Sequence, residues 1–108
     1  MPSALDRIGI VGASGYIGGA LTHALVAERG APRLFGRRSG RVAGLDIQAL
    51  TADAAQFSGL DSIVHLSGII SSRASEDELR RANVDLAVDV ARMAVEAMIL
   101  PRFGGHPC

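Results

Sequence analysis

Residues 7–19, which read RIGIVGASGYIGG, decide the fold of this chain. The β-branched run at residues 8–11 predicts a short buried strand, and the glycines that follow it end the strand. Apolar residues then recur at helical spacing, at Ile17, Leu21, Ala24 and Leu25. The segment is therefore a predicted strand, a glycine loop and a helix in direct succession.

The loop has the spacing Gly-x-x-Gly-x-x-Gly, with its glycines at Gly12, Gly15 and Gly18. In such a loop the first glycine allows the tight turn, the second lets the backbone approach a pyrophosphate, and the third allows close helix–strand packing. The helix that follows presents its N-terminal amides to an anion. We interpret the loop as a dinucleotide-binding turn, and the alternative is a glycine-rich turn without a ligand.

The rest of the chain alternates short strands with helices. Gly30 is the expected C-cap of the first helix, and Pro32 blocks its continuation. We expect strands at residues 33–35, 45–50 and 62–66, a polar loop at 37–44 and a helical turn at 54–57. The order predicts an α/β fold, a partial Rossmann fold whose parallel sheet of about four strands has the order 3-2-1-4, with helices on both faces.

The longest predicted helix runs from Ser75 to Met98. Ser75 can cap it, acidic residues fill its first turn, and Pro101 is expected to stop it. Its apolar stripe consists of Leu79, Ala82, Leu86, Val90 and Ala94. The helix either covers the sheet or pairs with a partner, which includes a second copy in a homo-oligomer, and coverage of the sheet is the simpler interpretation.

Composition narrows the class of protein. The 108 residues suit one domain, residues 1–108, and the formal net charge of zero argues against nucleic-acid and anionic-membrane binding. Cys108 is the sole cysteine, so neither a disulfide framework nor a cysteine metal site fits within one chain. We predict no metal site, no membrane-spanning run, and a soluble cytoplasmic protein.

Three segments together resemble a known family. Residues 8–18 resemble the opening of extended and atypical short-chain dehydrogenases, the NAD-dependent epimerase/dehydratase-like proteins. Residues 61–68, which read DSIVHLSG, resemble the fourth strand of that family, and Asn83-Val84 resembles its Asn-Val motif. The likeness covers residues 7–103. It implies the NAD(P)-binding portion of an epimerase, dehydratase or oxidoreductase that acts on a nucleotide-sugar or a related carbonyl or alcohol substrate.

The resemblance also implies cofactor contacts. Asp53 would lie beside the adenine with Ala54 near it, although Asp53 also fits an ordinary turn residue after a strand. Leu66, Ser67 and Gly68 would line the cofactor. The glycine loop would contribute Gly12, Ala13, Ser14, Gly15, Tyr16, Ile17 and Gly18. The long helix of this family often contributes to a dimer interface.

Arginines at the end of the second predicted strand favour NADP(H) over NAD. An acid at this place binds the ribose 2′-hydroxyl, whereas arginine accommodates a 2′-phosphate. Here Arg37 and Arg38 occupy it, Arg41 follows closely, and Asp46 is the first acid. The alternative is that these arginines form a solvated surface loop.

Catalytic residues are not expected in this chain. The resemblance implies a tyrosine with a lysine four residues later, but Tyr16 in the glycine loop is the single tyrosine and there is no lysine. His65 lies in an apolar strand, and we interpret it as a packed residue. The family's fifth strand should begin near Arg102-Phe103, so we expect a truncated domain with an unpaired edge that is inactive alone. The alternatives are a non-catalytic NADP(H) sensor and an inactive fragment with an interaction role only.

Overall fold

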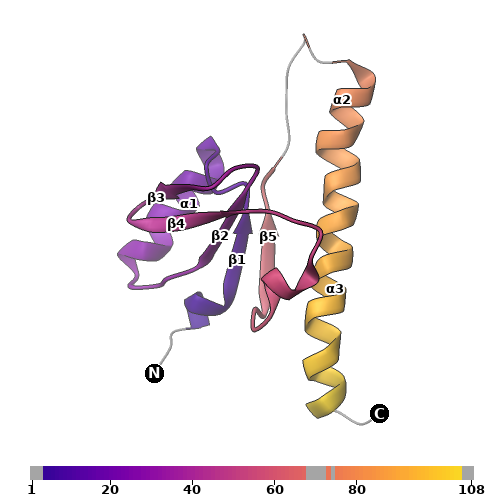
Figure 1. The fold of residues 1–108 in the computed structure, drawn as a ribbon. Helices are drawn as coiled ribbons and strands as arrows, with labels where there is room; N and C mark the ends of the chain where they lie inside the picture. The colour runs from indigo at the N-terminus through magenta and orange to yellow at the C-terminus, as the bar shows by residue number, and fades with distance from the viewer. Residues whose placement is uncertain (1–3, 68–72, 74, 106–108) are drawn as a thin grey trace.

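A mostly parallel sheet forms the centre of the molecule, with its strands in the order β3-β4-β2-β1-β5 (Figure 1). The computed structural model describes residues 4–67, 73 and 75–105. Its strands are β1 (Ile8–Val11), β2 (Arg33–Gly36), β3 (Gly40–Val42), β4 (Leu45–Ala49) and β5 (Ser62–His65). The four parallel strands among them follow the predicted order 3-2-1-4, which confirms the partial Rossmann fold.

The fifth strand, β3, was not expected, and the prediction of a loop throughout residues 37–44 is wrong. Gly40–Val42 pairs antiparallel with β4 at the edge of the sheet. Ala43 and Gly44 join the two strands, both with positive φ (52° and 82°), the conformation that a two-residue hairpin turn requires. Three residues are too few to show an alternating pattern, and this strand exists only through its hydrogen bonds to β4.

Helix α1 (Tyr16–Ala27) covers one face of the sheet. Gly18 and Thr22 are its buried residues, and the Thr22 hydroxyl donates a 2.7 Å hydrogen bond to the Gly18 carbonyl. Ile17 and Ala24 were expected in the apolar stripe, but both are exposed. The prediction failed because α1 packs closely on the sheet through the side of the helix that carries Gly18. Ile17 therefore points away from the sheet.

The end of α1 lies two residues earlier than predicted. Glu28 is the C-cap and Arg29 takes the left-handed conformation (φ 64°), so the assignment of Gly30 as the cap is wrong. The amide of Gly30 donates to the Leu25 carbonyl and that of Arg29 to Val26, the pattern of a Schellman motif. Gly30 is needed for packing, because a side chain there would collide with Leu5.

A long helical rod covers the other face (Figure 1). It consists of α2 (Glu76–Arg80), a π-helical turn η3 (Arg81–Asp85) and α3 (Leu86–Gly105). The Ser75 hydroxyl accepts a hydrogen bond from the Glu78 amide (3.1 Å), which confirms the predicted cap. The helix does not stop at Pro101, and Arg102-Phe103 lies in α3 rather than in a fifth strand. Proline removes one helical hydrogen bond, and that loss alone has not ended the helix here.

Two hydrophobic clusters hold these layers together, one on each face of the sheet. Leu34 and Phe35 are consecutive in β2 and belong to opposite clusters, as expected for a strand buried on both sides. Phe35 meets Phe57 of the short helix η2 (Ala54–Phe57) edge to face, with ring centroids 5.0 Å apart. Val90 and Met93 of α3 complete that cluster. Helices therefore cover both faces, as predicted.

Candidate cofactor-binding site

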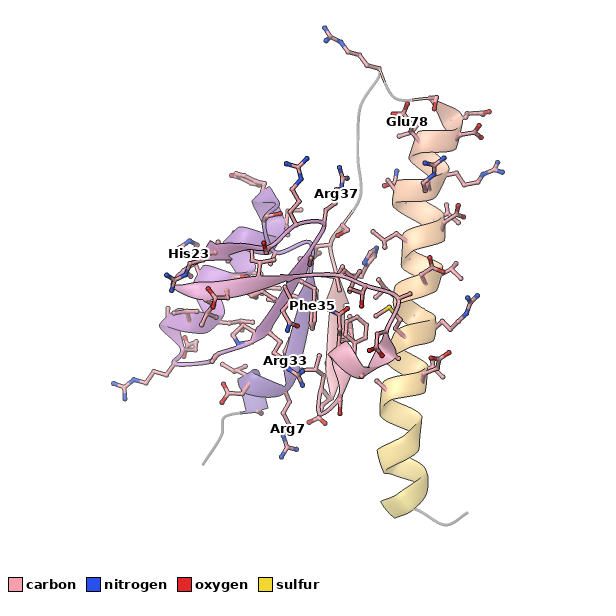
Figure 2. All side chains as sticks on the ribbon, in the orientation of Figure 1. Arg7, His23, Arg33, Phe35, Arg37 and Glu78 are labelled. Atoms are coloured by element: carbon pink, nitrogen blue, oxygen red, sulfur yellow. The ribbon has the colours of Figure 1, made fainter. Side chains whose placement is uncertain are left out.

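The candidate site lies at the carboxyl ends of the parallel strands. From β1 the chain passes through α1 to β2 on one side, whereas β5 pairs with β1 on its other side. Open α/β sheets bind ligands where the strand order reverses in this way. Figure 2 shows Arg37 at this end of the sheet and Arg7 and Arg33 toward the opposite end.

Gly12 makes the turn out of β1. Its φ is +93°, and its amide donates a 2.8 Å hydrogen bond to the Phe35 carbonyl, which fixes the loop to β2. A Cβ atom at Gly12 would lie 2.7 Å from the Ser67 nitrogen. Only glycine fits such a conformation and such a close approach, so the first predicted glycine role is supported by the geometry.

Gly18 and Gly15 have different surroundings. A Cβ atom at Gly18 would overlap the carbonyl oxygen of Gly12, so this glycine lets α1 pack against the loop. A Cβ atom at Gly15 would meet only the Gly12 carbonyl oxygen, at 3.4 Å. The space beyond Gly15 is therefore open, and the backbone there can be approached closely by a ligand.

The N-terminus of α1 faces this open space without a protein anion of its own. Gly15 is the N-cap with extended backbone (φ −76°, ψ 174°), it has no side-chain cap, and the first turn holds no acidic residue. The first helical hydrogen bond runs from the Gly19 amide to the Gly15 carbonyl (2.8 Å). The preceding amides of the first turn have no partner within the helix, and helix N-termini of this kind attract anions such as phosphate.

A cavity of about 480 Å³ joins the glycine loop to the arginine segment. Seven residues predicted from the sequence line it, namely Gly12, Ser14, Gly15, Arg37, Arg38, Leu66 and Ser67. Arg41, noted from the sequence as lying close by, lines it too. The structure adds Gly36, Ser39, Gly40 and Ile47. Ser39 and Gly40 come to the cavity because β3 folds back on β4, and no local pattern in the sequence indicated this pairing.

Arg37 and Arg38 carry charge that the described part of the chain leaves uncompensated. Both are exposed, and no ion pair within 4.0 Å includes either of them there. Arg41 differs, because its Nε lies 3.1 Å from the Asp46 carboxylate. The cavity thus has two unpaired guanidinium groups beside an uncapped helix N-terminus, and both features attract an anion.

A smaller cavity of about 200 Å³ continues toward the long helix. It shares Gly36, Arg37 and Ser67 with the larger one, and Val11, Leu50, Ala82 and Leu86 add an apolar wall. Neither Asp53 nor Ala54 lines either cavity. The Asp53 carboxylate accepts a hydrogen bond from the Ala55 amide (3.0 Å) and caps η2, so its role beside adenine stays a prediction.

Four other predicted residues, Ala13, Tyr16, Ile17 and Gly18, do not line either cavity. Ala13 is fully buried in the cluster under α1, and Gly18 is enclosed by the loop. Tyr16 and Ile17 start α1 with side chains that are 95% and 65% exposed. Gly68 lies outside the described residues.

His65 lies at the end of β5 with both ring nitrogens buried and without a hydrogen-bond partner in the described residues. Burial lowers the pKa of its imidazole below the ordinary value of 6.5. Over the same residues, no group of three or more His, Cys, Asp or Glu side chains is placed to hold a metal ion. No helix there is long and apolar enough to cross a membrane.

Comparison with known proteins identifies the family. The model of the NAD dependent epimerase/dehydratase family matches residues 8–103. The chain belongs to this family. None of the curated proteins matches the sequence.

Solved structures of dehydrogenases share the fold. L-threonine dehydrogenase from Clostridium difficile is 25% identical, with a TM-score of 0.69, over 85% of this chain and 34% of that one. Uronate dehydrogenase from Agrobacterium tumefaciens is 26% identical, with a TM-score of 0.61, over 85% of this chain and 37% of that one. A variant of the latter is complexed with NAD. The chain spans about a third of the length of these enzymes.

Proposed function

We propose that this chain binds a nicotinamide dinucleotide, with the pyrophosphate at the glycine loop and the adenosine ribose beside Arg37 and Arg38. The observation that carries the proposal is that both segments line one cavity. The uncapped N-terminus of α1 supplies amides for the pyrophosphate, and the open side of Gly15 allows its approach. Membership of an NAD-dependent family and the NAD complex of a related enzyme support the same ligand class.

We further propose that the preferred form is NADP(H). The 2′-phosphate carries a charge of about −1.5 to −2 at neutral pH, so it pairs well with guanidinium groups. Arg37 and Arg38 are the unpaired cations of the cavity, and no acid lines it to bind a 2′-hydroxyl instead. This arrangement favours the phosphate-binding interpretation over a solvated surface loop.

The smaller cavity is suited to the adenine ring. Leu50, Ala82 and Leu86 give it an apolar wall, and it opens beside Arg37 where the ribose would lie. A planar base gains from burial against such a wall through the hydrophobic effect. This placement of the adenine ring differs from the predicted placement beside Asp53. Substitutions in the cavity wall and at Asp53 distinguish the two placements.

The bound cofactor would supply hydride transfer, and the residues of this chain would bind and orient it. Oxidoreductase, epimerase or dehydratase chemistry on a nucleotide-sugar or a related carbonyl or alcohol is the activity we propose for an enzyme with this domain. The 108 residues contain no lysine, and we propose no catalytic residue among them. A non-catalytic NADP(H) sensor is the alternative, and it requires the same binding site.

The outer face of the long helix supports a homodimer. Val84, Val88 and Val95 are each at least half exposed and follow one another along this face. Charged residues beside these valines complement one another when two copies of the helix pack antiparallel. A twofold axis between residues 88 and 89 would then place Arg81 opposite Glu96 of the second copy, and Asp85 opposite its Arg92. A twofold homodimer uses the same surface on both copies, so that surface must be self-complementary. A cytoplasmic location stays a prediction.

Calorimetric titration of the purified chain with NADPH and NADH tests the function. We expect NADPH to bind more tightly than NADH, and Arg37→Ala to reduce this preference by about tenfold, the effect of about 1.4 kcal/mol. Arg7→Ala is the matched control, because it removes an exposed arginine, paired with Asp61, from the opposite end of the strands. A folded chain that binds neither dinucleotide would refute the proposal.

A further inference from the structure

The β3–β4 hairpin brings a third arginine to the cavity, and this arginine is ion-paired, unlike Arg37 and Arg38 in the described part of the chain. Arg41 lines the cavity, but its guanidinium is bound at the hairpin turn. Its Nε lies 3.1 Å from Asp46 Oδ1, and its Nη2 donates a 2.9 Å hydrogen bond to the Gly44 carbonyl oxygen. Arg41 and Asp46 are directly opposite each other in the antiparallel register.

The contact between Arg41 and Asp46 is easily exchanged. The two side chains are 69% and 85% exposed, and ion pairs in such settings contribute little because water and salt screen them. A phosphate monoester offers more charge and three acceptor oxygens, and it matches the guanidinium fork better than one carboxylate oxygen does. A phosphate in the cavity would therefore outcompete Asp46 for Arg41.

We propose that Arg41 is a specificity-determining residue for the 2′-phosphate, and that Asp46 competes with the phosphate for its guanidinium. This inference rests on the proposed binding of NADP(H). In the unliganded protein Asp46 holds Arg41 at the hairpin turn and neutralises it. When the 2′-phosphate binds beside Arg37 and Arg38, Arg41 leaves Asp46 and adds a third cation. Asp46 thereby lowers the affinity for NADP(H) without affecting NAD(H).

The competing interpretation is that Arg41 only braces the hairpin. Its contacts tie β3 to Asp46 in β4 and to Gly44 in the turn, so they also stabilise the edge of the sheet. The two interpretations make opposite predictions for Asp46. A brace loses ligand affinity when either partner is removed, whereas a competitor for Arg41 gains affinity for the phosphate when Asp46 is neutralised.

The test uses two probes that differ only in the phosphate of interest, adenosine 2′,5′-bisphosphate and 5′-AMP. The full 108-residue chain is titrated calorimetrically with each. We expect Arg41→Gln to weaken the bisphosphate about fivefold or more and to change 5′-AMP less than twofold. Asp46→Asn should strengthen the bisphosphate about two- to fivefold. Arg41→Lys should restore part of the affinity, because lysine binds phosphate as a point charge.

The double variant isolates the competition. In the wild-type chain, Asp46→Asn should raise the affinity for the bisphosphate, because it releases Arg41. In the Arg41→Gln chain there is no guanidinium to release, so the same substitution should raise the logarithm of this affinity by less than half as much. Thermal unfolding of each variant shows whether the hairpin persists, and a variant that fails to fold is replaced by Arg41→Lys in the comparison.

Each contrary outcome has a distinct meaning. An unchanged ratio of bisphosphate to 5′-AMP affinity in Arg41→Gln and Arg41→Lys would overturn this inference and leave dinucleotide binding intact. Weaker bisphosphate binding in Asp46→Asn would overturn it in favour of the brace. Equal binding of both probes by the wild-type chain would refute the 2′-phosphate subsite, and binding of neither would refute the proposed function as well.

Discussion

The carbonyl oxygen of Gly12 occupies the space that a side chain at Gly18 would fill. This contact joins the first residue after β1 to the first turn of α1, and it holds the helix N-terminus over the ends of the strands. The amide of Gly12 in turn binds the Phe35 carbonyl of β2 (2.8 Å). The proposed phosphate site is thus built from backbone groups of β1, α1 and β2, the three consecutive elements around the loop.

Two glycine substitutions should separate folding from binding. Gly18→Ala forces α1 away from the loop and should lower the free energy of unfolding by about 1–3 kcal/mol, the usual cost of overpacking. Gly15→Ala should change stability by less than about 1 kcal/mol, because its backbone is extended and its Cβ would be in ordinary contact. It should nevertheless weaken NADPH binding about tenfold, since the methyl group enters the cavity. Urea unfolding and calorimetry measure the two effects, and a Gly15→Ala chain with wild-type affinity would contradict the account.

Stability should depend on pH through His65. Its folded pKa is lowered by burial, so the unfolded chain binds a proton more readily than the folded one. The contribution of neutral His65 is fully present above the unfolded pKa of about 6.5 and is lost as the pH falls from there toward the folded pKa. The free energy of unfolding should therefore decrease between pH 7.5 and 5.5.

His65→Gln tests this pH dependence, and His23→Gln is its matched control. His23 lies exposed on α1, so its replacement keeps the buried imidazole while removing one histidine. We expect His65→Gln to show a flatter pH dependence of unfolding than the wild type and His23→Gln to retain it. Identical slopes in the wild type and in His65→Gln would show that other groups cause the dependence.

The outer stripe of the long helix should set the oligomeric state. Val88→Asp places a charge at the centre of the proposed twofold interface, so the sedimentation coefficient should change from that of a dimer to that of a monomer. Ala24→Asp introduces the same side chain on the exposed side of α1 and should leave the oligomer unchanged. A wild-type chain that sediments as a monomer at high concentration would contradict the proposed dimer.

Most of the fold could be predicted because its determining segments are local and strongly patterned. The β-branched strand at 8–11, the glycine spacing after it and the apolar run at 62–66 each indicate an element without reference to the rest of the chain. Parallel connections then restrict the strand order to few solutions. The capped start of the long helix was predictable for the same reason, since Ser75 and the acids after it are consecutive.

The errors concern features that depend on tertiary contacts. Gly40–Val42 becomes a strand only by pairing with β4. The left-handed residue after α1 is Arg29, whereas Gly30 follows it and is packed against Leu5. Ile17 is apolar and at helical spacing, yet it is exposed because α1 buries its glycine side. Pro101 shows that a breaker residue lowers helix stability without fixing the end of the helix.

The candidate site also has a part that could be predicted from local sequence and a part that depends on tertiary contacts. Its glycine loop and its arginine pair follow from local sequence, because each lies directly after a predicted strand. Ser39, Gly40 and Ile47 reach the cavity through the hairpin, and Leu50, Ala82 and Leu86 meet across the sheet–helix interface. Residues that come together from distant elements share no spacing in the sequence that could have revealed them.

Amide chemical-shift mapping with NADPH tests the central claim most directly. The account predicts that resonances of residues 12–18 and 37–41 shift on titration, with smaller changes around Leu50 and Ala82, while those of η1 (Ala4–Arg7) at the opposite end of β1 stay in place. Shifts confined to other surfaces, such as the groove between residues 50–52 and α3, or none in a folded chain, would contradict it.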